Sequence, residues 1–288
     1  SQWLCDWVVF LFLFTNEVLM STVSPKNILV TGATDGIGKA TALALAQLGH
    51  RVILHGRSPE KVQQTQAEIS RALPVAQLET VSANLASLAQ VRALATEITS
   101  RFERLDVLLN NAGVFMKEYQ ISPDGFEMTL AVNHLAPFLL THELLPLLRA
   151  SQARVVTVSS VAHTRGQIHF DDLNLTHSFE GYRAYAQSKL ANLLFSNELA
   201  EREMGKITSN SLHPGGVTTK LLKTGFGATG ISTTQGAETS VFLATSPTVE
   251  SVTGKYFSES REAPIAPQAL NKTHQKQLWQ MTEQLLDR

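Results

Sequence analysis

The stretch NILVTGATDGIGKATALALAQLG, residues 27–49, decides the fold class of this chain. A short apolar run leads into a turn that carries Gly32, Gly36 and Gly38, and an Ala- and Leu-rich segment of helical character follows. Glycine lets the chain turn sharply and lets the backbone approach a pyrophosphate, and the start of a helix offers free amides and a positive dipole end. A strand, a glycine turn and a helix in this order predict a dinucleotide-binding unit.

Further along the chain, short apolar runs alternate with longer segments of helical character. We expect strands at 27–31, 51–54, 78–81, 106–110, 154–159 and 208–213. We expect helices at 39–48, 59–72, 88–102, 126–149, 182–204 and 235–244. Such alternation requires crossover connections, so it predicts the α/β class: a doubly wound parallel sheet (Rossmann fold) with helices on both faces. No repeat or Gly/Ser-rich linker interrupts residues 20–288, which favours a single domain.

The composition excludes several classes of function. Of the 288 residues 43% are hydrophobic, so the chain can bury a substantial core. The 24 Lys and Arg residues nearly balance 25 Asp and Glu residues, and a formal net charge of −1 argues against nucleic acid as a partner. The single cysteine, Cys5, excludes an intrachain disulfide and a cysteine-based zinc site. His134 and His142 share a helical face without a third ligand at metal spacing, so we predict no metal site.

Residues 1–19 differ in composition from the rest of the chain and leave two interpretations open. The segment is mostly apolar, but Asp6 and Glu17 interrupt it, and the clean run is shorter than the roughly 20 residues of a membrane span. Its aromatic residues are typical of a membrane or interface anchor, which would make the protein membrane-associated. We favour the second interpretation, in which Met20 is the true start, the preceding residues are translated upstream sequence, and the protein is cytoplasmic.

Six motifs follow one another along the chain. They are TGATDGIG at 31–38, NNAG at 110–113, AVNHLAPF at 131–138, SS at 159–160, YAQSK at 185–189 and PGGVTT at 214–219. Together they resemble the motifs of the short-chain dehydrogenase/reductases, and the match extends from about residue 26 to 257. The segments GKYFSES at 254–260 and ALNKTHQKQLWQ at 269–280 look most like the retinol dehydrogenase-like branch. The resemblance implies an oxidoreductase that transfers a hydride between a nicotinamide dinucleotide and a carbonyl or alcohol.

The end of the second expected strand decides between NAD and NADP, because it points at the adenosine ribose. NAD-type members of the family carry an acid where this chain has Gly56, and Arg57 follows directly. Since arginine neutralises a 2′-phosphate, we predict NADP(H), with Arg57 as the main contact and Ser58 or Lys61 as helpers. Asn84 stands where the family usually has an aspartate that accepts a bond from the adenine amine, and an asparagine carbonyl can accept the same bond.

The resemblance also implies the full set of residues that contact the dinucleotide. They come from the glycine turn, the ends of the strands, the YAQSK motif and the PGGVTT motif. They are Gly32, Thr34, Asp35, Gly36, Ile37, Gly38, Arg57, Asn84, Leu85, Asn111, Ala112, Gly113, Tyr185, Lys189, Pro214, Gly215, Val217 and Thr219. Within this set, Thr219 and the backbone around Val217 are expected at the nicotinamide carboxamide.

Hydride transfer to a carbonyl leaves a developing alkoxide, which needs an acid close to the oxygen. Tyr185 and Lys189 are four residues apart in a helical segment and therefore share a face. By resemblance, Tyr185 is the general acid/base, and Lys189 lowers its pKa and holds the nicotinamide ribose. Ser160 is implied to donate to the substrate oxygen; strand alternation turns its competitor, Ser159, to the opposite side. Asn133 is implied to anchor a water that relays protons to Lys189.

The segment expected to cover the site, 217–234, indicates an apolar substrate. Residues 221–232 mix Leu, Phe, Ile and Gly with one charge, Lys223, and Gly225, Gly227 and Gly230 suggest a movable lid. We expect a lipophilic aldehyde or ketone, retinal-like by resemblance. The aliphatic segment 190–199 is either a homodimer face or ordinary sheet packing. The alternative function is a non-catalytic dinucleotide-binding redox sensor, against which the intact Ser, Tyr and Lys set argues.

Overall fold

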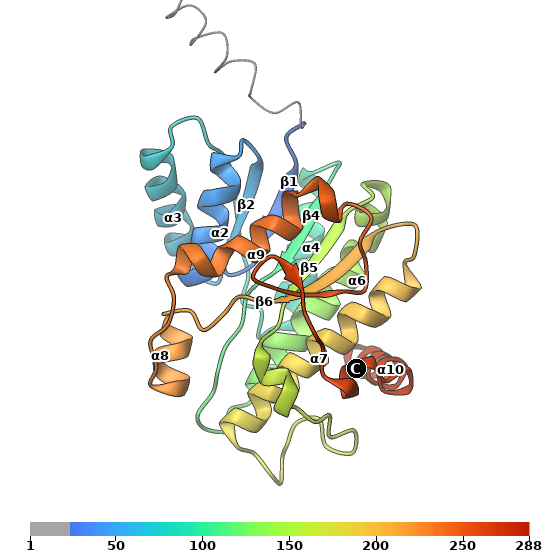
Figure 1. Ribbon diagram of the computed structural model, residues 1–288. Coiled ribbons are helices and arrows are strands. Elements are labelled where there is room, and N and C mark those ends of the chain that lie inside the picture. Colours follow the sequence, from blue (N-terminus) through green and yellow to red (C-terminus); the bar gives the residue numbers. More distant parts are fainter. Residues whose placement is uncertain (1–23, 288) are drawn as a thin grey trace, which may run out of the picture.

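The computed structural model describes residues 24–287, in which strands and helices alternate along most of the chain (Figure 1). The strands are β1 (Asn27–Val30), β2 (Arg51–Gly56), β3 (Gln77–Ser82), β4 (Val107–Asn110), β5 (Arg154–Val158), β6 (Thr208–His213), β7 (Tyr256–Ser258) and β8 (Arg261–Glu262). The helices are α2 (Gly36–Gln47), α3 (Pro59–Ala72), α4 (Leu88–Arg101), α5 (Met128–Leu130), α6 (Ala136–Ala150), α7 (Gly181–Arg202), α8 (Lys220–Phe226), α9 (Thr233–Thr245) and α10 (Lys272–Leu286). A π-helical turn (Ala131–Leu135) and short 3₁₀ turns at Val161–Arg165, Pro247–Val249 and Pro267–Leu270 complete the list.

All eight strands form one sheet in the order β3-β2-β1-β4-β5-β6-β7-β8. Neighbours from β3 to β7 run parallel, and β8 pairs with β7 in the antiparallel direction. The doubly wound α/β fold predicted from the sequence is confirmed. The strand order reverses between β1 and β4, and in open α/β sheets ligands bind beside such a switch point, outside the carboxyl ends of the strands.

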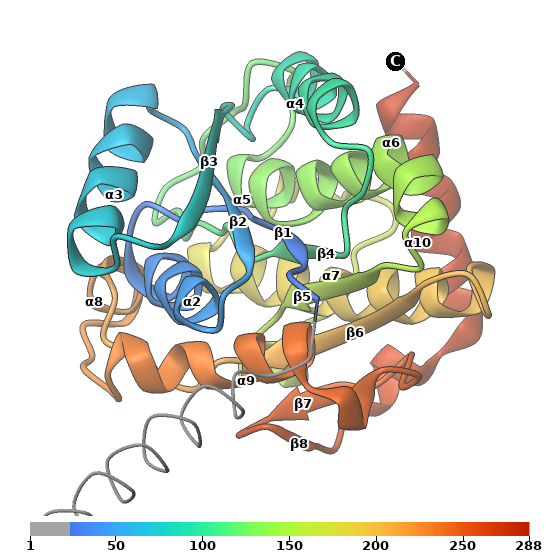
Figure 2. The ribbon, with the colours of Figure 1, turned by 90° about the horizontal axis from the view of Figure 1, so that it is seen from above.

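Alternate residues of each central strand enter opposite layers of the core. Leu29, Ile53 and Leu108 pack in the layer that includes α4, α6 and α7, whereas their neighbours Val30 and Leu54 pack in the layer that includes α2, α3 and α9. Figure 2 shows α2 and α9 on one side of the sheet and α4 and α6 on the other. Because helices cover both faces, the strands read in the sequence as continuous apolar runs.

The predicted helix 126–149 is confirmed as a helical segment, but it begins later and is not α-helical throughout: α5, a π-helical turn and α6 follow one another without a gap. The side chain of Glu127 accepts hydrogen bonds from the amides of Thr129 and Leu130, so the helix begins only at Met128. The π-helical turn follows, in which the amide of Ala136 donates to the carbonyl of Ala131 five residues earlier. Such turns are often found at functional sites, and this one contains Asn133.

Helix α10, which was not predicted, covers the aliphatic part of α7 (Figure 1). The ring centroid of Trp279 lies 4.7 Å from that of Phe138 and 6.0 Å from that of Phe195. The apolar side chains of 190–199 are buried within this one chain, which agrees with ordinary packing, and a homodimer stays a prediction. None of the described helices combines the length and the hydropathy needed to cross a membrane. The predicted anchor at residues 1–19 and the predicted start at Met20 lie outside the described residues.

Candidate active site

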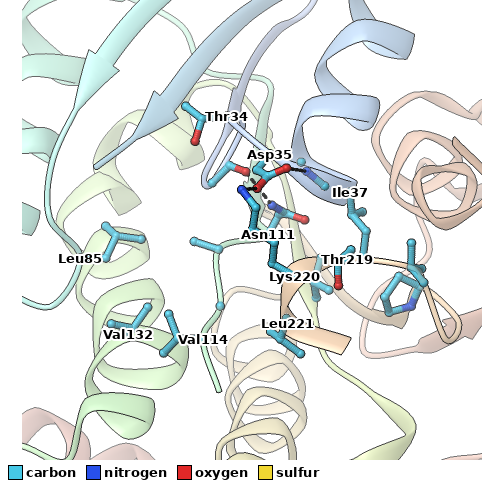
Figure 3. Close-up of a pocket in the computed structure, with 18 of the residues that line it drawn as sticks. Thr34, Asp35, Ile37, Leu85, Asn111, Val114, Val132, Thr219, Lys220 and Leu221 are labelled. Carbon is cyan, nitrogen blue, oxygen red and sulfur yellow. Dashed lines mark hydrogen bonds and ion pairs between the residues drawn. The ribbon is translucent and has the colours of Figure 1, made fainter. Parts of the chain in front are cut away.

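A pocket of about 980 Å³ opens beside the carboxyl ends of the strands (Figure 3). Its volume is at the upper end of the roughly 300–1,000 Å³ typical of ligand pockets. Every residue predicted to contact the dinucleotide lines it, together with Ser160, Tyr185 and Lys189. Asn133 does not line it. Residues that are far apart in the sequence are therefore brought to one cavity at the switch point of the sheet.

The glycine turn needs its glycines for steric reasons. Gly32 and Gly36 adopt φ angles of +68° and +54°, which favour a residue without a Cβ atom. A Cβ atom on Gly38 would lie 2.2 Å from the carbonyl oxygen of Gly32, closer than any real contact. The Nδ2 atom of Asn111 donates to the carbonyl of Thr31 at 2.7 Å. The NNAG motif thus holds the turn from behind and forms part of the pocket wall.

The end of β2 carries a positive charge but has no room for an acid. A Cβ atom on Gly56 would lie 2.5 Å from the Cγ2 atom of Thr34, so no larger side chain fits at this position. Arg57 lines the pocket, and within residues 24–287 no carboxylate forms an ion pair with it. Of the two predicted helpers, Lys61 also lines the pocket. Ser58 does not, because its hydroxyl caps α3 by accepting from the amide of Lys61 at 3.3 Å.

The pocket is also lined by two lysines, Lys39 and Lys220, that were not predicted from the sequence. Lys39 forms an ion pair with Glu68, and both residues line the pocket. Lys220 lies 2.6 Å from the Oδ2 atom of Asp35. The hydrogen bond from Lys220, more than any other contact, lowers the pKa of Asp35. Lys39 directly follows the motif TGATDGIG, and Lys220 directly follows the motif PGGVTT. This adjacency could have indicated that both lysines lie at the pocket.

Asn84 already uses its side-chain oxygen within the chain. Its Oδ1 atom accepts a hydrogen bond from the backbone amide of Ala86 at 3.1 Å, and the backbone amide of Asn84 donates to Oε1 of Gln90 at 2.7 Å. These bonds fix the turn that follows β3 at the edge of the pocket. An amide oxygen has a second lone pair, so the bond to an adenine amine stays a prediction.

Tyr185 and Lys189 lie one turn apart on α7, and both are buried. The Nζ atom of Lys189 is 5.5 Å from the centroid of the Tyr185 ring and donates to the carbonyl oxygen of Val158 at 3.0 Å. Val158 is the last residue of β5, so this bond ties the face of α7 that carries Tyr185 and Lys189 to the end of a central strand. The phenol and the ammonium group therefore reach the pocket from one rigid helix.

The pKa of Tyr185 differs from the sequence-based expectation. Burial raises it to about 12, and a hydrogen bond with Ser160 only partly opposes this effect. Burial also lowers the pKa of Lys189 to about 8. We had expected the lysine to hold the pKa of the tyrosine below its ordinary value. In this structure the removal of each group from water dominates, because desolvation disfavours each charged form.

The two adjacent serines have different surroundings. The hydroxyl of Ser159 is buried and donates to the backbone carbonyl of Lys189 at 2.7 Å. Ser160 follows the end of β5 and caps the next turn, its Oγ atom accepting from the amide of Ala162 at 3.2 Å. The hydroxyl of Ser160 also forms the hydrogen bond with Tyr185. Geometry thus places Ser160, rather than Ser159, beside the phenol.

Asn133 lies behind the pocket wall and is fully buried. Its Oδ1 atom accepts from the amide of Val114 at 2.8 Å, and its Nδ2 atom donates to the carbonyl of Val114 at 3.0 Å and to Oγ of Ser188 at 3.0 Å. The side chain therefore clamps the segment after β4 against α7. The predicted relay of protons through a water held by Asn133 stays a prediction.

Apolar side chains form part of the pocket wall. They come from Val114, Met116, Met128, Val132, Val161, Ala162, Tyr182, Leu221 and Leu222. In Figure 3, Val114 and Val132 point into the cavity from one wall and Leu221 stands at the other. Apolar linings with a few convergent polar groups are typical of sites for small organic ligands. Within the described part of the chain, no cluster of His, Cys, Asp and Glu residues could hold a metal ion.

The loop that carries α8 is closed at its base. Val217 pairs with Ile231, and the hydroxyl of Thr218 accepts from the amide of Gly230 at 2.8 Å. A Cβ atom on Gly230 would lie 1.6 Å from a backbone oxygen, and Gly227 ends α8 with a φ angle of +62°. The glycines that suggested a movable lid therefore have local steric roles, and the motion stays a prediction.

Residues 26–227 match the family model of the short chain dehydrogenases. Human retinol dehydrogenase 14 is 40% identical, with 90% of this chain and 85% of that protein covered. Human retinol dehydrogenase 13 is 40% identical, with 92% and 86% covered.

Solved structures have the same fold. An uncharacterised protein from Mycobacterium paratuberculosis superposes with a TM-score of 0.75 at 32% identity, over 91% of this chain and 93% of that one. A short chain dehydrogenase from Escherichia coli CFT073, complexed with NADPH, has a TM-score of 0.68 at 28% identity, over 84% and 99%. The chain thus belongs to the short-chain dehydrogenase family, in its retinol dehydrogenase-like branch, whose members are oxidoreductases that act on alcohol or carbonyl groups with a nicotinamide dinucleotide.

Proposed function

We propose that this protein is an NADP(H)-dependent oxidoreductase that interconverts a lipophilic aldehyde or ketone and its alcohol. The observation that carries the proposal is the convergence of Ser160, Tyr185 and Lys189 on the same pocket that the glycine turn lines. A pocket of this kind holds an elongated dinucleotide beside an acid and a hydrogen-bond donor.

In the proposed reduction, the bound dinucleotide supplies the hydride that adds to the carbonyl carbon. Ser160 holds the substrate oxygen through its hydroxyl, and Tyr185 gives its proton to that oxygen as negative charge develops there. The ammonium group of Lys189 stabilises the tyrosinate left behind and binds the ribose hydroxyls. Oxidation of the alcohol uses the same groups in reverse, with Tyr185 as the base.

The choice of NADP(H) rests on the end of β2. Gly56 cannot be replaced by an acid without a clash with Thr34, so the carboxylate that would bind a free ribose 2′-hydroxyl is sterically excluded here. Arg57 and Lys61 offer two positive charges at the same place. Several of the similar solved structures are complexes with NADP or NADPH, which agrees with this choice.

The lipophilic substrate is inferred from the apolar side chains that form part of the pocket wall. Two methionines, Met116 and Met128, line it, and their flexible side chains adapt to long apolar ligands. The retinol dehydrogenases to which this chain is similar are named for an apolar alcohol, which agrees with this inference.

The test is consumption of NADPH and of NADH with a panel that contains octanal, all-trans-retinal and a polar sugar aldehyde. We expect NADPH to be used faster, and both apolar aldehydes to be reduced in preference to the sugar. Tyr185→Phe should reduce turnover by orders of magnitude and leave NADPH binding unchanged, whereas Tyr119→Phe, outside the pocket, should keep the full rate. Full turnover by Tyr185→Phe would refute the mechanism, and NADPH binding without turnover of any aldehyde would favour the redox sensor.

A further inference from the structure

The ring of His163 is buried directly behind Ser160. His163 belongs to the 3₁₀ turn Val161–Arg165, for which Ser160 is the N-cap, and only 1% of its surface is exposed. Its Nδ1 atom lies 2.6 Å from the carbonyl oxygen of Ser160, and its Nε2 atom lies 3.3 Å from the amide nitrogen of Ala266. One ring therefore connects the serine turn to a segment more than a hundred residues later.

The two partners determine the protonation state of this ring. The carbonyl of Ser160 can only accept a hydrogen bond, so Nδ1 carries the proton and donates it. The backbone amide of Ala266 can only donate, so Nε2 must accept. The ring is therefore neutral, and this agrees with burial, which lowers the pKa of His163 against the opposing bond to Ser160.

Other contacts make the C-terminal segment a brace for the same turn. The Nε2 atom of Gln268 lies 3.4 Å from the carbonyl oxygen of Thr164 and 3.3 Å from that of Gly166. The ring of Tyr256, on β7, meets the His163 ring edge-on with centroids 5.0 Å apart. The imidazole is thus held on three sides, and only its Nδ1–H reaches the serine.

We propose that His163 is a positioning residue for Ser160: its Nδ1–H holds the serine backbone so that the hydroxyl faces Tyr185, and the segment around Ala266 holds the ring. The proposal rests on the proposed function, since it assigns His163 to the same reaction. His163 itself does not line the pocket; it contacts the lining residue Ser160 only from behind. Its effect should therefore appear in the chemical step and leave dinucleotide affinity unchanged.

Amide side chains can separate the two hydrogen bonds of the ring. In His163→Asn the amide nitrogen stands near the place of Nδ1 and keeps the donor to Ser160. In His163→Gln the longer amide stands near the place of Nε2 and keeps only the contact to Ala266. His163→Leu removes both bonds. We measure the single-turnover rate of NADPH oxidation with octanal, and the dissociation constant of NADPH by fluorescence.

The Leu and Gln variants should lower the single-turnover rate by roughly tenfold to a hundredfold, because a displacement of about 1 Å at a reacting group can cost about a hundredfold. The Asn variant should stay within about threefold of the unmodified rate, and all three should bind NADPH with unchanged affinity. The proposal is overturned if the Leu or the Gln variant keeps the full rate, or if the Asn variant loses as much as the Leu variant.

His50 provides the matched control. It is also buried, and its Nδ1 atom accepts from the amide of Lys26 at 3.3 Å, but it precedes β2 at the end of the sheet opposite to the pocket. His50→Leu should lower the free energy of unfolding without slowing the chemical step. An equal loss of rate in His50→Leu and His163→Leu would show a general structural effect and overturn the positioning role.

Hydrogen exchange separates this inference from the proposed function. If the unmodified protein reduces no aldehyde, the proposed function fails. Amide exchange of the peptide covering 160–166 then tests whether His163 holds the backbone of the serine turn. His163→Leu and His163→Gln should then exchange faster in that peptide, and His163→Asn should exchange as the unmodified protein does. Unchanged exchange in His163→Leu would overturn the brace.

Discussion

The Nζ atom of Lys220 and the Oδ2 atom of Asp35 lie 2.6 Å apart, and this ion pair joins the two walls of the pocket (Figure 3). Asp35 caps α2 within the glycine turn, its other oxygen accepting from the amide of Gly36 at 2.8 Å, and Lys220 is the first residue of α8. A Cβ atom on Gly36 would lie 3.2 Å from Cγ2 of Thr219. The start of α8 is therefore in contact with the turn that is proposed to bind the pyrophosphate.

Lys220→Gln should weaken the binding of NADPH, because it removes a positive charge beside the proposed phosphate site. Both side chains of the pair are largely exposed, so the effect should be modest, roughly two- to fivefold in the dissociation constant at low salt. It should shrink at high salt as screening increases. Fluorescence titration with NADPH at two ionic strengths measures it. Lys276→Gln, an exposed lysine of α10, should leave the constant unchanged, and equal constants for Lys220→Gln and the unmodified protein at low salt would contradict the prediction.

Arg57→Asp should invert the preference between the two dinucleotides. The variant replaces a cation that can pair with a 2′-phosphate by an anion that repels the phosphate and accepts from a free ribose hydroxyl. We expect kcat/KM for NADPH to fall by roughly tenfold to a hundredfold, the size of a lost charged hydrogen bond. Steady-state rates with both dinucleotides give the ratio. A variant that still preferred NADPH would refute the role of Arg57, and Arg71→Asp, at the far end of α3, serves as the charge-matched control.

Lys189 should make stability depend on pH. Burial lowers its pKa from the ordinary value of 10.5 to about 8, so the native chain releases this proton before the unfolded chain does. Between those two values the unfolded state binds more protons, and stability therefore rises with pH through the window. Lys189→Met has no such proton. The stability of the unmodified protein relative to this variant should thus increase by up to about 1.4 kcal/mol per pH unit.

Urea unfolding at pH 7.5 and pH 9.5 tests this dependence. The difference in free energy of unfolding between the unmodified protein and Lys189→Met should change in favour of the unmodified protein at the higher pH. Lys276→Met, which changes an exposed lysine, should show the same difference at both pH values. A constant difference for Lys189→Met would show that the native pKa is not lowered.

Trp279→Ala should destabilise the protein strongly. The indole is 5% exposed and packs against Phe138 and Phe195, and the guanidinium carbon of Arg202 lies 4.5 Å from its ring centroid. Loss of a buried tryptophan leaves a cavity and costs about 3–5 kcal/mol. Urea unfolding measures the loss, and Leu270→Ala, at an exposed position, should cost far less. A small loss for Trp279→Ala would mean that α10 contributes little to the core around α7.

The expected strands and helices agree closely with the observed ones where each element repeats a local pattern several times. β6 matches its prediction at both ends, and so does α3, which has Ser58 as its cap and Pro59 at its first position. Two of the missed elements are too short to repeat a pattern, since β7 has three residues and α8 has seven. Another, α10, has 15 residues and was missed although it is long enough to repeat one. The later start of the helical segment 126–149 could not be predicted, because the carboxylate of Glu127 caps α5 from inside the expected element.

Residue order was sufficient for the doubly wound fold and for naming part of the residues that line the pocket, since periodicity and glycine-turn chemistry act over a few neighbouring residues. Long-range packing decided the rest. It raised the pKa of Tyr185, turned Asn133 into a clamp behind the wall, paired Asp35 with Lys220, and put His163 between Ser160 and Ala266. Desolvation and hydrogen bonds between distant segments depend on which groups surround a residue in space. The residues next to it in the sequence do not determine those surroundings.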